Sequence, residues 1–309
     1  MSDERFALTA KFQESANAFA QALIQPISQE LPKFFEKEDA AQGQDAYLAQ
    51  SAAGASPKTA GFADIFERNP YTNPEMLKTN IQEAAERGWI DLTEKGFTAS
   101  PKAQAFTDKL VQMLKDSAGS READLTVDLA RLMALLGKLV ESAQAVEAFA
   151  DKPNFTFGRN FEYTDKTPSL MWVRRHLITM GAYRDDSHIA AWKPYDLPGY
   201  VWETFTFVWQ DEAHTAAELA EKLPFRGYTG ENYSQALAQL AERGWLQADG
   251  DRYTLTEEGR KQRQLAEDKT NENYQAAFEA LSEAELKEVI SLLKALTEEI
   301  TIEENTQPA

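Results

Sequence analysis

The chain has 309 residues, enough for about two domains, and 32 basic against 50 acidic residues give it a net charge of −18. This charge opposes loose attraction to nucleic acid or to an anionic membrane. The sequence has no cysteine, which excludes disulfides and thiolate metal sites. No apolar run approaches the roughly 20 residues that span a bilayer, and the first residues show no signal-peptide pattern. We therefore expect a soluble cytoplasmic protein without a membrane partner.

The N-terminal part is predicted to be helical. In residues 5–36 apolar side chains recur at intervals of three and four, the spacing of one helix face. Pro26 and Pro32 are expected to kink or divide this helix, because a proline inside a helix lacks the N–H group and clashes with the preceding turn. Residues 40–58 are rich in Ala, Gln, Ser and Gly, and they predict a short helix followed by a loop.

A first winged helix-turn-helix unit is predicted at about residues 59–116. Residues 73–75 (NPE) have the pattern of an N-cap, a first-turn proline and a first-turn acid, so they predict the start of its second helix. Gly88 is expected to end that helix, because glycine enters left-handed conformations without strain. Residues 94–96 (EKG) predict a shorter wing tip than that of the second half.

A long helix and a linker are predicted in the middle of the chain. Residues 122–150 carry a heptad-like apolar seam, which needs a partner helix. Residues 151–167 mix turn-forming and aromatic residues without a helical period, which predicts the linker there. A matching seam in residues 282–300 opens with a capping box. The two apolar helices are expected to pack on each other or on the N-terminal helices.

Aromatic residues are concentrated in residues 155–209, interleaved with His, Asp and Glu. One interpretation is a ligand pocket between the long helices and the second winged unit, because such pockets have aromatic walls and a few convergent polar groups. The alternative is that these side chains fill the core of the second half, which the helical spacing of residues 170, 173, 177 and 180 favours. The candidate pocket residues are Trp172, His176, Tyr183, His188, Trp192, Trp202 and Glu203.

A second winged helix-turn-helix unit is predicted at about residues 202–268. Gly244 is expected to end its second helix. Asp249 and Gly250 form a strong two-residue hairpin signal. Thr256 is expected to cap the helix that follows the hairpin.

The two units share a sequence pattern. The letters AERGW stand at residues 85–89 and again at 241–245, an offset of 156 residues. The same offset places Thr59 on Thr215, whereas the pair YT, at 71–72 and 228–229, is out of step by one residue. A repeat of this length predicts an internal duplication. The predicted halves are residues 1–152 and residues 153–309.

The second half resembles the MarR group of winged-helix regulators. The resemblance is carried by the hairpin ending in LTEEG at residues 255–259 and by the final helix opening LSEAE at residues 281–285. It is good for residues 215–300 and weaker for residues 59–150. MarR proteins are homodimers in which the final helix forms the interface, so the resemblance implies a mainly α-helical, single-chain pseudo-dimer with pseudo-two-fold symmetry that is monomeric in solution. Residues 183–192 (YRDDSHIAAW) show a fainter similarity to SalK-like proteins, which are also single-chain relatives of MarR.

The resemblance implies transcription regulation by binding double-stranded DNA, tuned by a small aromatic ligand. A recognition helix needs polar side chains for base edges, and helix and wing need Lys or Arg for phosphates. The rival interpretation is a degenerate regulator that binds a small molecule or a protein instead of DNA. A positive surface along both second helices would favour DNA, and a negative one the rival. The candidate DNA contacts are Lys78, Thr79, Gln82, Lys95, Arg226, Ser234, Gln235 and Arg252.

Enzyme chemistry is not indicated by any motif. The sequence has no nucleophile elbow, no phosphate loop and no Gly-rich cofactor turn, so no cofactor is expected. With three histidines and no cysteine, residues 185–188 (DDSH) do not predict a zinc site. An acid–base pair such as His188 with Glu203 is the open alternative.

Overall fold

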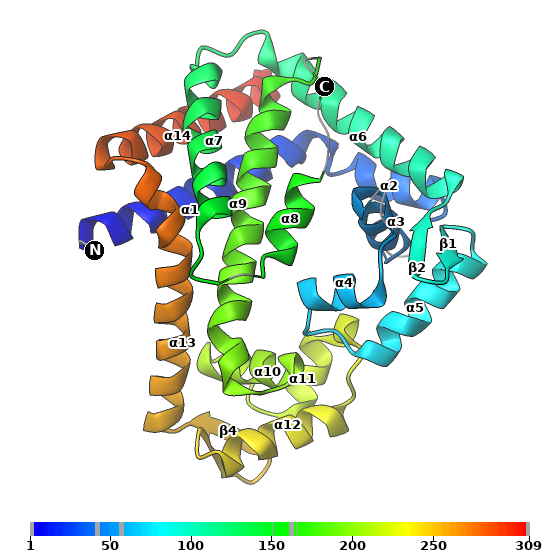
Figure 1. Ribbon diagram of the computed structural model, residues 1–309, viewed down its shortest axis with the longest axis vertical. Coiled ribbons are helices and arrows are strands. Elements are labelled where there is room, and N and C mark those ends of the chain that lie inside the picture. Colours follow the sequence, from blue (N-terminus) through cyan, green and yellow to red (C-terminus); the bar gives the residue numbers. More distant parts are fainter. Residues whose placement is uncertain are drawn as a thin grey trace.

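The computed structural model describes residues 3–40, 44–55, 59–149, 151–160, 164 and 166–306. The described chain is mainly helical with two small antiparallel hairpins, which confirms the predicted α-rich class (Figure 1). Within this part of the chain, no helix is both long and apolar enough to cross a bilayer.

Four helices form two packed pairs, the first of which joins the start of the chain to its last helix. Helix α1 packs along α14, and α7 packs along α9. Helix α1 is also held to the segment that precedes α14, because Arg5 Nη2 donates to the carbonyl of Leu281 at 2.6 Å and the ring of Phe12 meets that of Phe278 edge-on at 5.2 Å. The central elements are α1 (Asp3–Ile24), α7 (Leu129–Ala145), α8 (Pro153–Arg159), α9 (Ser169–Trp192), η5 (Ala276–Ala280) and α14 (Glu283–Thr306).

Two peripheral units each have a hydrophobic core of their own. Pro26 lies in the short helix η1 between α1 and α2, so the predicted division of the N-terminal helix is confirmed. The first unit and the segment leading to it contain η1 (Gln25–Ile27), α2 (Glu30–Lys37), α3 (Gln44–Ala55), α4 (Phe62–Arg68), α5 (Pro74–Glu86), β1 (Ile90–Thr93), β2 (Gly96–Ala99) and α6 (Pro101–Glu122). The second unit contains η3 (Lys193–Tyr195), α10 (Gly199–Trp209), α11 (Ala216–Lys222), η4 (Pro224–Arg226), α12 (Gly230–Glu242), β3 (Leu246–Asp249), β4 (Arg252–Leu255) and α13 (Glu257–Gln275).

The helix starts follow local capping chemistry. Asn73 caps α5 as predicted, since its side chain accepts from the backbone N–H groups of Glu75 and Met76. Thr229 caps α12 in the same way. Thr256 caps α13 as predicted. These side chains satisfy backbone donors that a helix cannot satisfy within itself.

The two units have corresponding elements at nearly constant offsets. Helix α5 and strands β1 and β2 recur 156 residues later as α12, β3 and β4. The preceding helices α4 and α11 are offset by 154, since their N-caps are Gly61 and Thr215. The predicted alignment of Thr59 with Thr215 was therefore wrong, because the second turn, which contains η4, is longer by two residues rather than one.

Four local predictions need correction. Both hairpins pair four residues with four across two-residue turns, so the tip at residues 94–96 is not shorter. The turn of the second hairpin is formed by Gly250 and Asp251, one residue later than predicted. Residues 122–150 do not form one helix, because α6 ends at Glu122 and α7 begins at Leu129 with Asp128 as its N-cap. The predicted linker contains helix α8, which starts at Pro153 and buries Phe155.

Candidate nucleic-acid interface and central cavity

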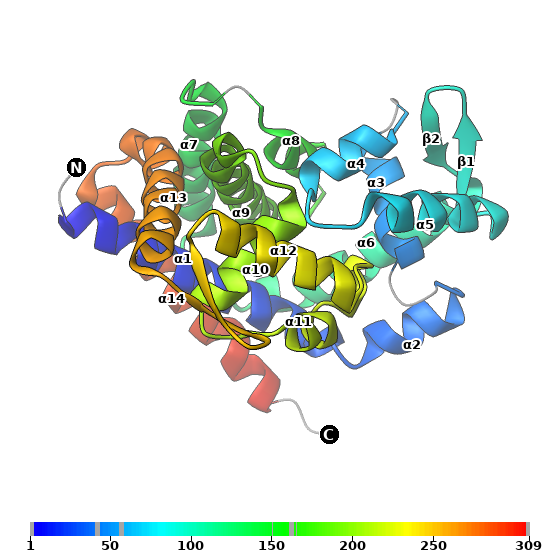
Figure 2. The same cartoon turned by 90° about the horizontal axis from the view of Figure 1, so that it is seen from below.

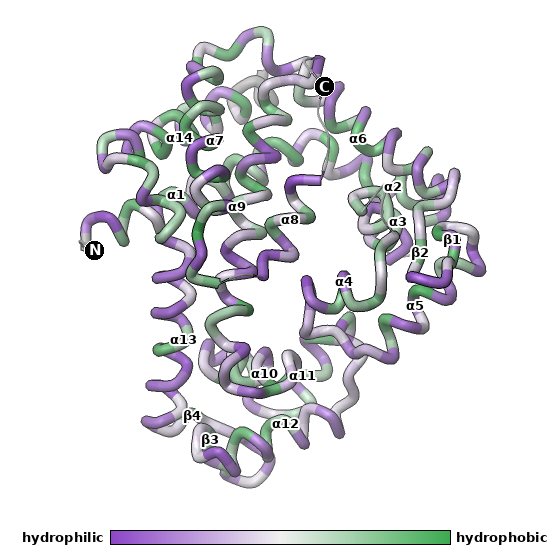
Figure 3. The backbone as a smooth tube through the Cα atoms, in the orientation of Figure 1, coloured by the Kyte–Doolittle hydropathy of each residue, from purple (hydrophilic) through white to green (hydrophobic). Residues whose placement is uncertain are grey.

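The exposed face of α5 carries the first group of candidate DNA contacts. Leu77 and Ala84 are buried while Lys78, Thr79 and Gln82 are exposed, which gives α5 the alternation of hydrophilic and hydrophobic segments seen in Figure 3. Lys78 Nζ pairs with Glu75 at 2.7 Å, so part of its charge is already matched. The amide of Gln82 donates to the carboxylate of Glu86, and the hydroxyl of Thr79 donates to the backbone of α5.

The second group lies on α12 and the hairpin tips. Ser234 and Gln235 are exposed on α12, and Lys95 and Arg252 are exposed at the two hairpins. Neither of these two cations forms an ion pair with a residue that the structure describes. Residues 74–99 carry three basic and five acidic side chains and residues 230–255 carry two and four, so each stretch has a net charge of −2. This sign is the one expected for the rival interpretation.

The turns that precede α5 and α12 are joined by hydrogen bonds. The backbone N–H of Asn73 donates to the carbonyl of Arg226 at 2.8 Å, and its side-chain amide donates to the carbonyl of Gly227 at 2.9 Å. The hydroxyl of Tyr228 donates to the carbonyl of Thr72 at 3.4 Å. We call this contact, between residues 69–76 and 224–229, the turn junction.

An ion pair next to the turn junction joins Arg226 and Glu203, which were predicted for different sites. Arg226 Nη2 lies 2.6 Å from Glu203 Oε1, and its Nε donates to the same carboxylate. Arg226 Nη1 donates to the side-chain oxygen of Asn69 at 3.0 Å. Burial raises the pKa of Glu203, and the bonds from Arg226 oppose that rise. Both side chains are less than one-fifth exposed, so Arg226 is committed to Glu203 rather than presented to a phosphate.

The turn junction sets how α5 and α12 face outward. In Figure 2 the two helices lie one after the other, with hairpin β1–β2 beyond α5. Their N-terminal ends meet at the junction, where the side chain of Met76 lies against Gly227. Helices of 13 residues are about 20 Å long, so their midpoints lie within about 30 Å even if collinear. Half-sites on DNA are roughly 34 Å apart, and the N-terminal residues of a recognition helix contact the bases.

The seven candidate pocket residues are distributed over several environments. Trp202 is fully buried in the second core, and Tyr183 is fully buried in the central core, where its hydroxyl donates to the carbonyl of Asn273 at 2.8 Å. Trp172 and His176 lie together on α9, 6.3 Å between ring centres. Burial, with the charges of two nearby arginines, lowers the pKa of His176 to about 4. Of the seven, Trp192 alone lines the largest of the described cavities.

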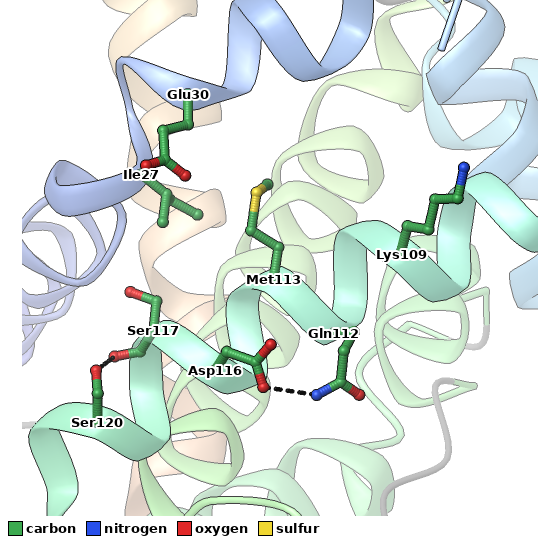
Figure 4. A pocket seen from close by; sticks show the side chains of 8 residues that line it. All are labelled: Ile27, Glu30, Lys109, Gln112, Met113, Asp116, Ser117 and Ser120. Carbon is green, nitrogen blue, oxygen red and sulfur yellow. Dashed lines mark hydrogen bonds between the residues drawn. The ribbon is translucent and has the colours of Figure 1, made fainter. Parts of the chain in front are cut away.

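Two further hollows are small or open. His188 lines a hollow of about 310 Å³ between α9, the end of α10 and α13. Burial lowers the pKa of His188 to about 4, and its Nδ1 lies 3.3 Å from the hydroxyl of Thr270, so no acid–base pair with Glu203 is formed. A shallow groove along α6 has polar side chains that bond to one another, such as Gln112 to Asp116 at 2.7 Å (Figure 4).

The largest described cavity, of about 1000 Å³, lies between the first unit and helices α8 and α9. We call it the central cavity. Its walls come from α3, α4, the α7–α8 connection, α8 and the C-terminal end of α9 with η3. The apolar walls are Phe66, Phe149, Phe157 and Trp192.

Three charged side chains reach the walls of the central cavity without being exposed. Asp186 is 2% exposed and accepts from the backbone N–H groups of Asn154 and Phe155 at 3.1 and 2.8 Å. Burial outweighs these bonds and raises the pKa of Asp186 to about 6. Lys152 donates to backbone carbonyls at the end of α7, and burial lowers its pKa. Arg68 lies over the ring of Phe157 at 3.8 Å, and burial lowers the pKa of its guanidinium.

The comparisons with known proteins agree with the class of the second unit. Residues 176–306 match the model of a helix-turn-helix family. The matched segment runs from the middle of α9 to the end of α14 and contains α11, α12 and the hairpin β3–β4. The chain therefore contains a helix-turn-helix domain, the type of domain that DNA-binding regulators use. No curated protein and no solved structure matches the chain.

Proposed function

We propose that the protein is a single-chain pseudo-dimer of winged-helix units that binds a small organic molecule in the central cavity and does not dock both units on DNA. The observation that carries this proposal is the turn junction. It joins the N-terminal ends of the two helices that would read DNA, and Asn73 and Arg226 hold those ends together by a 2.8 Å backbone hydrogen bond.

The correspondence of elements supports the duplicated origin. Helix, hairpin and following helix recur at an offset of 156 residues, and helix α7 recurs as α14 near the same offset. The first long helix packs on the last one, and α7 packs on α9, as expected if each half lends a helix to the other. A chain that already contains both partners needs no second copy, so light scattering should give the mass of a monomer. A stable dimer would contradict the pseudo-dimer.

The charge distribution supports the loss of DNA docking. Each unpaired cation that meets a phosphate adds about one unit to the salt dependence of binding. The candidate surface offers Lys95 and Arg252 as exposed cations without an ion pair to a described residue. Two contacts at opposite ends of a surface that is negative on balance leave little electrostatic affinity for DNA.

DNA binding through the second unit alone is the second candidate function. It is favoured by the match of residues 176–306 to a helix-turn-helix family and by the polar side chains Ser234 and Gln235 on the exposed face of α12. In this mode the second unit, with Arg252 on its hairpin, would contact the duplex, and the first unit would lie outside the groove.

The two candidates differ in their affinity for DNA. We expect no binding of a random-sequence duplex at micromolar protein in 50 or 200 mM salt, measured by fluorescence anisotropy. Sub-micromolar binding that weakens steeply with salt and is abolished by Lys78→Glu with Arg252→Glu would favour the DNA-binding candidate. Binding that this double variant leaves unchanged would place the contact on another surface.

A further inference from the structure

The central cavity lies beside α3, whose buried side chains are smaller than those of α10, the helix in the same place of the chain order in the second unit. Helix α3, which precedes the first unit's α4, presents Ala46, Ala49 and Ala52 to its core, whereas α10, which precedes α11, presents Trp202, Phe205 and Val208. All six side chains are buried, so the two helices contribute very different side-chain volumes to their cores. On the same helix α3, Ser51 and Ala55 line the central cavity.

A guanidinium in the cavity wall, that of Arg68, forms no ion pair with a described residue. Burial lowers its pKa, and the nearby carboxylate of Asp64 partly offsets this lowering. Arg68 donates from Nε to the backbone carbonyl of Asp64 at 3.2 Å and from Nη2 to the hydroxyl of Ser51 at 3.1 Å. Among the residues that the structure describes, none forms an ion pair with Arg68, and its Nη1 donates no hydrogen bond to any of them. The ring of Phe157 at 3.8 Å holds the guanidinium plane in place.

The other interior charges of the cavity are already matched. The ammonium group of Lys152 donates to the carbonyls of Ala143, Gln144 and Val146, which end helix α7. The carboxylate of Asp186 accepts three hydrogen bonds, two of them from Asn154. A charge that is partly removed from water without an ion pair is costly, and a ligand of opposite charge bound to the guanidinium lowers that cost.

We infer that the central cavity binds one organic anion per chain, with its carboxylate or phosphate on the guanidinium of Arg68 and its apolar body among the aromatic walls. This inference rests on the proposed function, since it assigns the chemistry of the ligand to the same cavity. An arginine fork suits the two oxygens of such a group, and the ring of Phe157 limits the orientations of the fork. The volume of about 1000 Å³ admits a molecule of drug-like size.

The test compares naphthalene-2-carboxylate with its neutral amide by calorimetry on the full chain. A charge-assisted hydrogen bond is worth roughly a 10- to 100-fold difference in affinity, so the carboxylate should bind more tightly than the amide by that factor. This comparison uses the wild-type protein and does not depend on the folding of a variant. Equal affinities for the two compounds would overturn the assignment to Arg68.

Three variants separate the inference from the proposed function. Arg68→Met keeps the contact with Phe157 and should lower the affinity for the carboxylate roughly 10- to 100-fold while leaving the amide unchanged. Lys222→Met is the matched control, because Lys222 ends α11 as Arg68 ends α4, and it should change neither affinity. Ala55→Trp fills the cavity and should abolish both.

The outcomes are distinct. If Ala55→Trp abolishes binding and Arg68→Met does not weaken the carboxylate, the cavity binds ligands but the anion assignment is wrong. If neither compound binds, or if Ala55→Trp leaves both affinities unchanged, the proposed ligand site is wrong, and so is the inference that rests on it.

Discussion

The side chain of Asn73 has two structural roles at the turn junction, and substitutions can separate them. Its side-chain oxygen caps α5 by accepting from the N–H groups of Glu75 and Met76 at 2.9 and 3.3 Å. Its side-chain amide donates across the junction to the carbonyl of Gly227 at 2.9 Å. An N-cap contributes about 1 kcal/mol. A hydrogen bond of this kind also contributes about 1 kcal/mol, because its loss leaves a partly buried carbonyl unpaired.

Three substitutions distinguish helix capping from the hydrogen bond across the junction. Asn73→Ala should lower the free energy of unfolding by about 2 kcal/mol, since it removes both the cap and the cross-junction bond. Asn73→Asp keeps an acceptor at the N-cap but loses the donor, so it should cost about 1 kcal/mol. Thr229→Ala is the control, because Thr229 caps α12 without a side-chain bond to the first unit, and it should cost about 1 kcal/mol.

The assay is urea unfolding followed by circular dichroism at 222 nm, with all four proteins compared under one condition. Asn73→Ala should have the lowest unfolding midpoint, and the other two variants should lie between it and the wild type. If Asn73→Asp unfolds at the midpoint of the wild type, or if Asn73→Ala is no worse than Thr229→Ala, the junction does not stabilise the arrangement of the two units.

Two further predictions concern packing and pH. Gly199→Ala should lower the free energy of unfolding by about 1–3 kcal/mol, because a Cβ there would lie 2.2 Å from the carbonyl oxygen of Pro70, whereas Gly230→Ala, with open space around it, should be near neutral. Equal unfolding midpoints for these two variants would show that α10 and the first turn separate easily. The pKa of Asp186 is raised from 3.8 to about 6, so the folded protein disfavours its ionised form. The loss of stability caused by this carboxylate is absent below pH 4 and grows as pH rises through 6. Asp186→Asn should therefore gain stability relative to wild type by up to about 3 kcal/mol between pH 4 and pH 7.5 in urea unfolding, and a pH-independent difference would contradict the raised pKa.

Local features of the fold were predictable because they depend on a few neighbouring residues. The capping of α5 by Asn73 followed from an Asn-Pro-Glu pattern. Gly88 and Gly244 end α5 and α12 with φ of 74°, a conformation that glycine adopts without strain. The length of the turn before α12 was not predictable to the residue, because the insertion there has no periodic pattern and forms the short helix η4.

The candidate site was less predictable, because it depends on contacts between distant segments. Sequence spacing placed Arg226 on a DNA surface and Glu203 in a ligand pocket, and nothing in the local sequence indicated that they form an ion pair 2.6 Å long. The central cavity was missed for a similar reason. Its signal was the run of small residues in 44–55, where Tyr47 and Leu48 are the only large apolar side chains, in contrast to the aromatic-rich residues 199–209.

The central cavity borders α3 but not α10, and this difference between the units suggests a reason for keeping them in one chain. In a symmetric pair, each unit would have the same cavity and the same exposed recognition helix. Here Trp202 and Phe205 fill the core of the second unit, while α3 of the first unit has buried alanines and borders the central cavity with Ser51 and Ala55, beside Arg68. The filled unit also supplies Arg226 and Glu203 to the turn junction, so it fixes the position of α4, the helix that carries Arg68. One half can then act as a rigid support and the other as the binding half. The proposed duplication within one chain would permit this division, because two copies in one polypeptide can change independently.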